Sequence, residues 1–205
     1  MLDLRLFRHP PFAAATLAAL ANGIAVIGVM SFACSLFISA AGLSSLGAAL
    51  LLFAWSGPSA VSALLARRLP AALGGARQLA LGLTGTAAGD LATVGQLPGS
   101  VWHLVPGLVL SGAASGVLNA GLGREAVASV PPDRAALGSG ANNTARYLGS
   151  SIGVTLVVVI ATSTGTGRSA AVAGWNHALL ISAGAAVFFA ALLLALHRQS
   201  ARREG

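Results

Sequence analysis

The sequence predicts an all-α integral membrane domain with six spanning helices. Of its 205 residues, 56% are hydrophobic and 8% are charged, whereas a soluble domain carries about 25% charged residues. The mean hydropathy is +0.82, and no Asp, Glu, Lys or Arg occurs between His9 and Ala66. That run far exceeds the apolar core of about 7 to 15 residues in a secretory signal peptide. The start is therefore expected to be a retained spanning helix, and the alternation typical of membrane β-barrels is not seen.

Six apolar stretches follow one another along the chain. A helix that crosses a bilayer needs about 20 mainly apolar residues. Gly42, Leu43 and Ser44 divide the first charge-free run, and Pro98-Gly99 ends the third stretch. The expected spans, all within a single domain of residues 1–205, cover residues 12–40, 45–66, 79–97, 101–122, 140–162 and 175–196.

The positive charges predict the orientation of the chain. The net charge is +7, and every cationic side chain other than histidine is an arginine. Cytoplasmic loops of membrane proteins collect arginine. With the N-terminus inside, ten of the twelve arginines lie on inner segments, and the outer loops hold only Arg168. Both termini are therefore predicted to be cytoplasmic, with Trp102 and Trp175 at outer helix ends as interfacial anchors.

The same distribution of residues excludes several classes of function. The arginines form short clusters between apolar runs, so no nucleic-acid partner is expected. A single cysteine, Cys34, and four dispersed histidines predict neither a disulfide nor a metal site. Residues 121–124 lack the third glycine of a dinucleotide motif, so no cofactor is expected. An intramembrane serine protease is disfavoured because the triplet at 138–140 lies on the opposite side from His103 and His177, so no catalytic residue is expected.

Asp90 is the only acid inside an expected span. Thr86 and Thr93, four residues before and three after it, share its helical face. An acid at membrane depth costs about 2.5 to 3.5 kcal/mol on insertion scales and often relays protons or binds cations. Asp90 is therefore a candidate protonatable or cation-attracting group. The alternative is a structural acid that is hydrated near the outer surface or bonded to a neighbouring helix.

Further polar residues mark the fifth span. Asn142, Arg146, Gly149 and Gly153 share one helical face, and Asn143 belongs to a second polar row beside it. Arg146 is either a fixed cation near the inner mouth of a pathway or an arginine that snorkels to the headgroups. The two glycines form a small-xxx-small pattern, which predicts a close contact with another helix.

Small and polar residues in other spans predict a tightly packed bundle with a mildly polar interior. Asn22 and Asn119 could contact a substrate, although an interhelical hydrogen bond is the commoner role of such residues. Gly57-Pro58 inside the second span predicts a helix kink, a recurrent feature of transporters that ordinary packing also tolerates. Rows of small residues recur in the first, third and fourth spans, for example Gly82, Gly85 and Gly89, or Gly112 and Gly116.

Three strings in the inner loop and fifth span resemble a known family. They are GLGREAV at 121–127, VPPDR at 130–134 and GSGANNTARYLG at 138–149. They are similar to the region of the tenth and eleventh helices, counted in a twelve-helix core, of the major facilitator superfamily, in its fourteen-helix drug:proton antiporter branch. LDLRLF at 2–7 resembles the lead into the C-terminal six-helix half of those transporters. The loop strings ARRLP at 66–70 and GGAR at 74–77 resemble the family's inner-loop signature, without its acid.

The resemblance implies a bundle of two three-helix inverted repeats, with substrate passing between two such bundles by alternating access. It covers nearly the whole chain but only half of a family member. A second six-helix bundle, from a second copy of this chain or from another chain, is then an expected partner beside the lipid bilayer, a small-molecule substrate and the proton.

The expected function is therefore efflux of small lipophilic or cationic compounds, coupled to protons, across the cell membrane of a bacterium. Asp90 would be the protonatable group. The cavity lining would come from Asn22, Asn119, Asn142, Asn143 and Arg146. The alternative is a truncated or split transporter half that serves as a partner subunit, or as an inactive fragment, with no transport of its own.

Overall fold

The computed structural model describes residues 6–7, 9–69, 73, 75–163 and 165–204. Within these residues the regular structure is entirely helical. The stretch 2–5 and the loop positions Pro70 and Gly74, which contributed to the family resemblance, lie outside the described residues.

Six long helical segments account for most of the described chain. The first, Pro10–Ala41, is continuous and is here called the N-terminal helix; it consists of α1 (Pro10–Asn22), the π-helical turn η2 (Gly23–Ile27) and α2 (Gly28–Ala41). The other five are α3 (Ser45–Leu65), α4 (Ala76–Thr93), α5 (Leu104–Ala128), α6 (Ala135–Ser163) and α7 (Arg168–Glu204). Short 3-10 turns flank them: η3 (Ala66–Arg68), η5 (Val101–His103) and η6 (Pro132–Arg134).

The helices overlap the six stretches expected as spans, although α7 (Arg168–Glu204) extends well beyond the expected 175–196 and the helix in the third stretch ends early. It was expected to run to residue 97, but α4 ends at Thr93. Gly95 adopts a left-handed backbone conformation, with φ of 75°, and its N–H donates to Asn176 Oδ1 at 2.9 Å. The chain thus leaves the helix at this glycine, before Pro98 is reached.

Five helices in the described residues are long and apolar enough to cross a membrane, and α4 is not among them. Its 18 residues include Gln78, Thr86, Asp90 and Thr93, all of which are buried inside the bundle. The opposite face of α4 is open, with Leu81 51% and Leu91 50% exposed. The reduced hydropathy of α4 therefore reflects the polar residues that it buries on its inner face.

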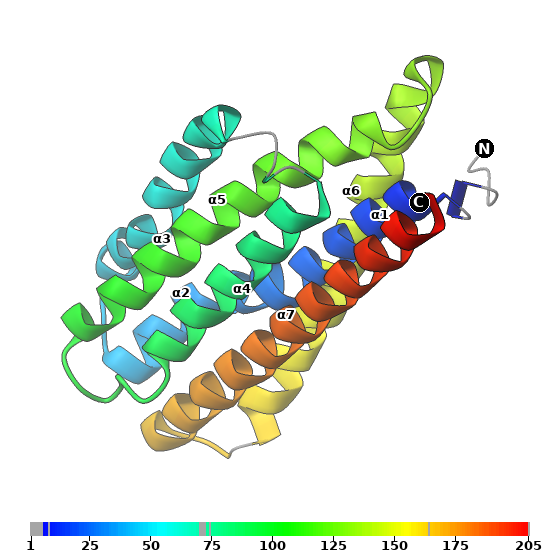
Figure 1. Ribbon diagram of the computed structural model, residues 1–205. Coiled ribbons are helices and arrows are strands. Elements are labelled where there is room, and N and C mark those ends of the chain that lie inside the picture. Colours follow the sequence, from blue (N-terminus) through cyan, green and yellow to red (C-terminus); the bar gives the residue numbers. More distant parts are fainter. Residues whose placement is uncertain (1–5, 8, 70–72, 74, 164, 205) are drawn as a thin grey trace.

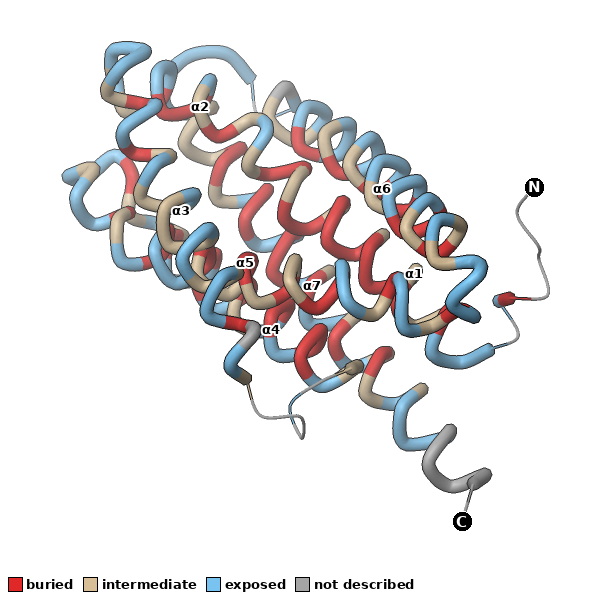
Figure 2. The backbone as a smooth tube through the Cα atoms, turned by 90° about the horizontal axis from the view of Figure 1, so that it is seen from above, coloured by how far each residue is buried: buried red, intermediate tan, exposed pale blue. Residues whose placement is uncertain are grey.

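The arrangement in Figure 1 places α4 between α5 and α7. The α5 helix also packs against α3, and the N-terminal helix packs against α6 and α7. Figure 2 shows the buried positions concentrated along the centre of the bundle, whereas α3 and α6 are more exposed. The start of α1 and the end of α7 lie at the same end of the bundle (Figure 1). This arrangement agrees with an even number of crossings.

Glycines allow the helix backbones to approach one another closely. A Cβ atom at Gly149 would lie 2.2 Å from the Leu20 carbonyl oxygen, and one at Gly153 would lie 2.5 Å from that of Ile24. The small-xxx-small contact predicted in the fifth span is thereby confirmed. Gly112 makes the same kind of approach on α5, where a Cβ would lie 2.0 Å from the Trp55 carbonyl oxygen of α3.

The two tryptophans that were expected as interfacial anchors differ in their exposure. Trp102 is 76% exposed, as an interfacial anchor requires, but Trp175 is 0% exposed, so its expected anchor role is wrong. The Trp175 ring packs edge-on against Phe37, with centroids 5.5 Å apart, because α7 turns this side chain toward the N-terminal helix. At Gly57-Pro58, helix α3 continues unbroken through the proline.

The sequence analysis did not expect the irregular turn in the N-terminal helix. In η2 the Gly28 N–H donates to the Gly23 carbonyl, five residues earlier. Both glycines contact α6: a Cβ at Gly23 would lie 2.3 Å from the Arg146 carbonyl oxygen, and one at Gly28 would lie 2.6 Å from Gly153. The wider π turn therefore brings two glycines spaced by five residues onto one face of the helix.

Candidate functional site

The candidate site is centred on the carboxyl group of Asp90, which is 2% exposed. Ser111 Oγ of α5 donates to Asp90 Oδ1 at 3.1 Å. Ser182 Oγ of α7 lies 2.7 Å from Asp90 Oδ2 and 2.5 Å from the Ala25 carbonyl oxygen of η2. Asp90 is thus bonded to neighbouring helices, as one of its two expected roles required, and no arginine is among the hydrogen-bond partners recorded for it.

Thr86 and Thr93 share the buried face of Asp90, as the sequence spacing predicted. Their hydroxyl groups, however, donate to carbonyls of their own helix. Thr86 bonds to Gly82 at 2.9 Å, and Thr93 bonds to Gly89 at 2.8 Å. The polar partners of Asp90 therefore come from α5 and α7, while the two threonine hydroxyls form their hydrogen bonds within α4.

Close packing of α4 on α5 brings Ser111 within reach of Asp90. A Cβ at Gly89 would lie 2.4 Å from the Ser111 nitrogen, and a Cβ at Gly107 would lie 2.2 Å from Thr93 Oγ1. Larger residues at these two positions would separate the helices. The glycine row predicted on the third span therefore allows the Ser111 hydroxyl to reach the carboxyl group of Asp90.

Asn22 and Asn119 meet between the N-terminal helix and α5. Asn22 Nδ2 donates to Asn119 Oδ1 at 3.2 Å, and Asn119 Nδ2 donates to the Ser115 carbonyl at 2.9 Å. The interhelical hydrogen bond, the commoner of the two expected roles, is confirmed. Asn119 is half-buried and also lines an open pocket with Leu64 and Arg124.

A double-mutant cycle tests this pair. Because Asn119→Ala leaves the buried Asn22 amide without its acceptor, each single alanine variant should lose nearly as much stability as the double variant. We expect a coupling free energy of about 0.6 kcal/mol, the average for hydrogen bonds between membrane helices. The measurement is the unfolding free energy of the three variants in detergent, and additive losses would contradict the bond.

The polar residues of the fifth span separate onto two sides of α6. Asn142 is buried and its Nδ2 donates to the Ala15 carbonyl of α1 at 3.4 Å. Asn143 is exposed and its Oδ1 accepts from Arg146 Nη2 at 3.0 Å. The guanidinium carbon of Arg146 lies 5.6 Å from the Tyr147 ring centroid, a cation–π contact. Arg146 is half-buried and lies along α6 between an amide and a ring.

The π turn η2 connects these otherwise separate groups. It begins directly after Asn22, its Ala25 carbonyl accepts from Ser182, and its Gly23 contacts the backbone of Arg146. Asp90 and the asparagine pair are thus linked through the N-terminal helix. Asn142 and Asn143, in contrast, have their recorded side-chain contacts with α1 and with Arg146, away from the acid.

Sequence reasoning did not single out Ser182. It is the one hydroxyl-bearing residue in the apolar stretch 175–196. A single hydroxyl group in such a stretch could have marked it as a candidate site residue. Ser111 did not stand out either, because it lies directly beside the glycine row of Gly112 and Gly116. Its pairing with Asp90 depends on which helix packs against α4, which a pattern within one span does not show.

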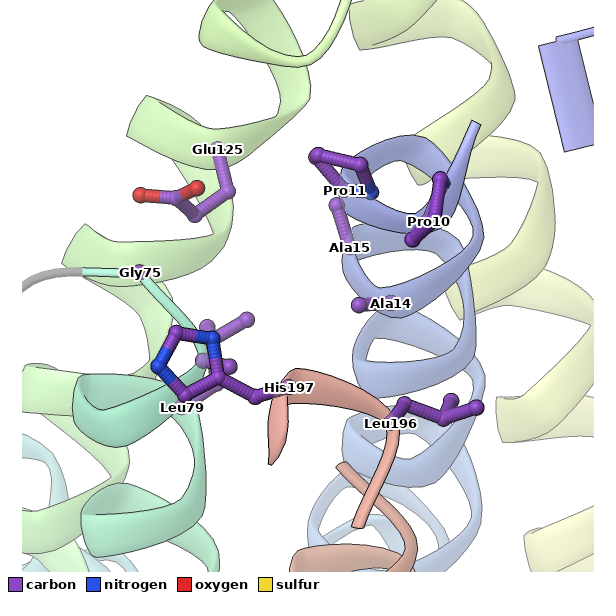
Figure 3. A pocket seen from close by; sticks show the side chains of 10 residues that line it. Pro10, Pro11, Ala14, Ala15, Gly75, Leu79, Glu125, Leu196 and His197 are labelled. Carbon is purple, nitrogen blue, oxygen red and sulfur yellow. The ribbon is translucent and has the colours of Figure 1, made fainter. Parts of the chain in front are cut away.

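A second feature that the sequence analysis did not identify is a cavity of about 230 Å³ at the end of the bundle where α1 begins and α7 ends. Figure 3 shows Glu125 from α5 and His197 from α7 on its wall, opposite Pro10 and Pro11 of α1. Beside it, Arg124 donates to Gln78 Oε1, and Gln78 Nε2 donates to the Val117 carbonyl at 2.8 Å. These bonds fasten the start of α4 to α5.

Metal binding receives no support from the described part of the chain, where no group of three or more His, Cys, Asp or Glu side chains could hold an ion.

The apolar helices and the acid enclosed between them define the class of this protein: a multi-pass, all-α membrane protein. Its fold is similar to that of the xylose transporter XylE from E. coli in a partially occluded inward-open conformation, with a TM-score of 0.60 and 18% sequence identity. The match covers 94% of this chain and 48% of the transporter chain, so the chain spans about half the length of that protein. No protein-family model and no curated protein sequence matches the chain.

Proposed function

We propose that this chain is one half of a major-facilitator-type transporter that exports small lipophilic or cationic compounds in exchange for protons. The observation that carries the proposal is the fold, which matches a transporter chain over 94% of this chain. The family resemblance of the inner-loop strings, stated from the sequence, points the same way. The location we propose is the cell membrane of a bacterium.

The helix contacts support two three-helix repeats related by inversion. Such an inversion exchanges the N-terminal helix, α3 and α4 with α5, α6 and α7. It therefore maps the contact of the N-terminal helix with α6 onto the contact of α5 with α3, and both occur here. Both also depend on glycine, at Gly23 in the first and at Gly112 in the second. The α4–α7 pair, which holds Asp90 and Ser182, maps onto itself.

Asp90 is the proposed protonatable group. A buried acid whose recorded partners are two serine hydroxyls has no cation to neutralise it, and an unpaired buried charge is costly. Such a group gains and loses a proton in preference to remaining charged. The proposed cavity lining consists of Asn22, Asn119, Asn142, Asn143 and Arg146.

A second bundle is required because one half has no opposing wall to move against. The exposed face of α6 carries Asn143, Thr144, Ser151 and Thr155. Side-chain amides and hydroxyls of this kind can form hydrogen bonds across a helix–helix interface. We propose that this face meets the second bundle, either a second copy of this chain or another chain.

The test is transport by the purified chain in proteoliposomes. With an imposed pH gradient, we expect movement of a fluorescent lipophilic cation that exceeds the movement in empty liposomes. The mass of the chain in nanodiscs is measured in parallel, and we expect a dimer. A monomer without transport would contradict export by this chain alone and favour a partner subunit or an inactive fragment.

A further inference from the structure

Ser182 makes two short contacts but has only one hydrogen to donate. The Ser182 hydroxyl has one hydrogen, yet its oxygen lies 2.5 Å from the Ala25 carbonyl oxygen and 2.7 Å from Asp90 Oδ2. A carbonyl oxygen can only accept, so two simultaneous hydrogen bonds at Ser182 require its own hydrogen in the contact with Ala25 and a hydrogen from the acid in the contact with Asp90.

This assignment satisfies every group with a neutral Asp90. Oδ2–H donates to Ser182, Ser182 donates to Ala25, and Ser111 donates to Oδ1. An ionised Asp90 would leave two oxygens 2.5 Å apart with no hydrogen between them. It would also leave a carboxylate, 2% exposed, without a cation, which is costly in a low-dielectric interior.

We propose that Ser182 is the positioning residue that couples the proton on Asp90 to the π-helical turn of the N-terminal helix. The inference rests on the proposed protonatable role of Asp90 and extends it to a named partner and a named moving element. While the acid is protonated, the Ser182 hydrogen holds the Ala25 carbonyl within η2.

When Asp90 loses its proton to water, the single Ser182 hydrogen has a stronger acceptor. Hydrogen bonds to a charged oxygen are roughly twice as strong as those between neutral groups. Ser182 therefore turns toward the carboxylate, and the Ala25 carbonyl loses its side-chain donor. The π turn loses a contact that stabilises it against the ordinary α-helix, the commoner form by far.

The glycines of η2 show what conversion of the turn would change. Gly23 and Gly28 are five residues apart and both contact α6. Five residues in an α-helix correspond to about 1.4 turns, so closing η2 into α-helical geometry would rotate Gly28 away from Gly153. The contact between α2 and α6 would then rearrange, as a conformational step in a transporter requires.

Other charged groups do not account for this network. On the elements packed around Asp90, the titratable and charged side chains nearest to it in sequence lie toward the helix ends, at least five residues along the helix from Asp90, Ser111 or Ser182. This is about 7.5 Å or more along a helix axis. They are Arg77 on α4, His103, Arg124 and Glu125 beside or on α5, and Arg168, His177, His197 and Arg198 on α7. The N-terminal helix is preceded by His9 and carries the thiol of Cys34, nine residues after Ala25.

Infrared spectroscopy of the resting protein tests the proton directly, because a protonated carboxyl group and a carboxylate absorb at different frequencies. At neutral pH we expect the wild type to show a buried carboxylic acid band that is absent in Asp90→Asn. The band should shift in Ser182→Ala and stay in place in Thr86→Val, since Thr86 is buried on the same face but bonds to Gly82. A carboxylate band lost in Asp90→Asn would overturn the proposal.

The only cysteine in the chain provides the conformational readout. Cys34 is half-buried on α2, beyond the π turn. We expect Ser182→Ala to change the rate of Cys34 alkylation at fixed pH by about three- to tenfold, the factor given by the net free energy of one hydrogen bond. Asp90→Asn should keep the wild-type rate, because the asparagine amide donates to Ser182 as the neutral acid does.

These measurements separate the inference from the proposed function. An unchanged Cys34 rate in Ser182→Ala would overturn the coupling even if transport and the acid band are observed. Conversely, an acid band together with an altered rate would support the coupling in a chain that transports nothing by itself. If Ser182→Ala does not fold, the spectra of the wild type and Asp90→Asn still decide whether Asp90 carries a proton.

Discussion

Asp90→Asn is expected to reduce pH-gradient-driven efflux to the level of empty liposomes. An asparagine fits the site of the neutral acid: its amide can donate to Ser182, and its oxygen can accept from Ser111. The helix packing should therefore persist while the exchangeable proton is lost. The measurements are transport of a fluorescent lipophilic cation in proteoliposomes and binding of the same cation, and we expect binding to remain.

Asp133→Asn is the matched control for that experiment. Asp133 lies in the turn before α6, its side chain is 77% exposed, and it is 3.9 Å from Arg134 Nε. Exposed ion pairs contribute little to stability, so this variant should transport as the wild type does. Efflux that is unchanged in Asp90→Asn would remove Asp90 from the mechanism.

The second large effect is expected at Gly112, where α5 touches the backbone of α3. A Cβ there would lie 2.0 Å from the Trp55 carbonyl oxygen and 2.8 Å from its carbonyl carbon. Backbone atoms of a packed helix cannot move aside without separating the two helices. Overpacking of this kind costs typically about 1 to 3 kcal/mol, so Gly112→Ala should lower the unfolding free energy and the Tm in detergent.

Gly123→Ala provides the comparison on the same helix. Gly123 is exposed, and a Cβ there would meet no atom within 4 Å. Because alanine is the better helix former, this variant should gain about 0.5 to 1 kcal/mol. Equal Tm values for the two variants would show that the α3–α5 contact is looser than the structure indicates.

Several features of the site could be predicted because they depend on one helix at a time. The spacing of Thr86, Asp90 and Thr93 places them on one face of any α-helix. The spacing of Gly149 and Gly153 likewise predicts a close helix contact. Both features are present. The interhelical role of Asn22 and Asn119 followed from the general behaviour of asparagine in membrane helices, although the sequence did not show that they bond to each other.

The burial of Trp175 illustrates why its predicted role as an interfacial anchor was wrong. Trp175 was expected at an outer helix end, but α7 begins earlier, at Arg168, and the side chain is buried against Phe37. An apolar stretch of nearly uniform hydrophobicity shows no amphipathic face. Which side of α7 turns inward is therefore decided by the neighbouring helices.

The sequence by itself determined the all-helical class, the approximate positions of the long helices and the isolation of one acid among them. The reason is that a helix that crosses the bilayer needs a long, mainly apolar stretch, which can be read directly from the residues. The tertiary structure alone decided that Asp90 pairs with Ser182 and Ser111, and that the N-terminal helix widens into a π turn at Gly23–Ile27. These depend on contacts between residues 21 to 157 positions apart. Local periodicity specifies the face of a helix, whereas only packing specifies the helix that lies opposite.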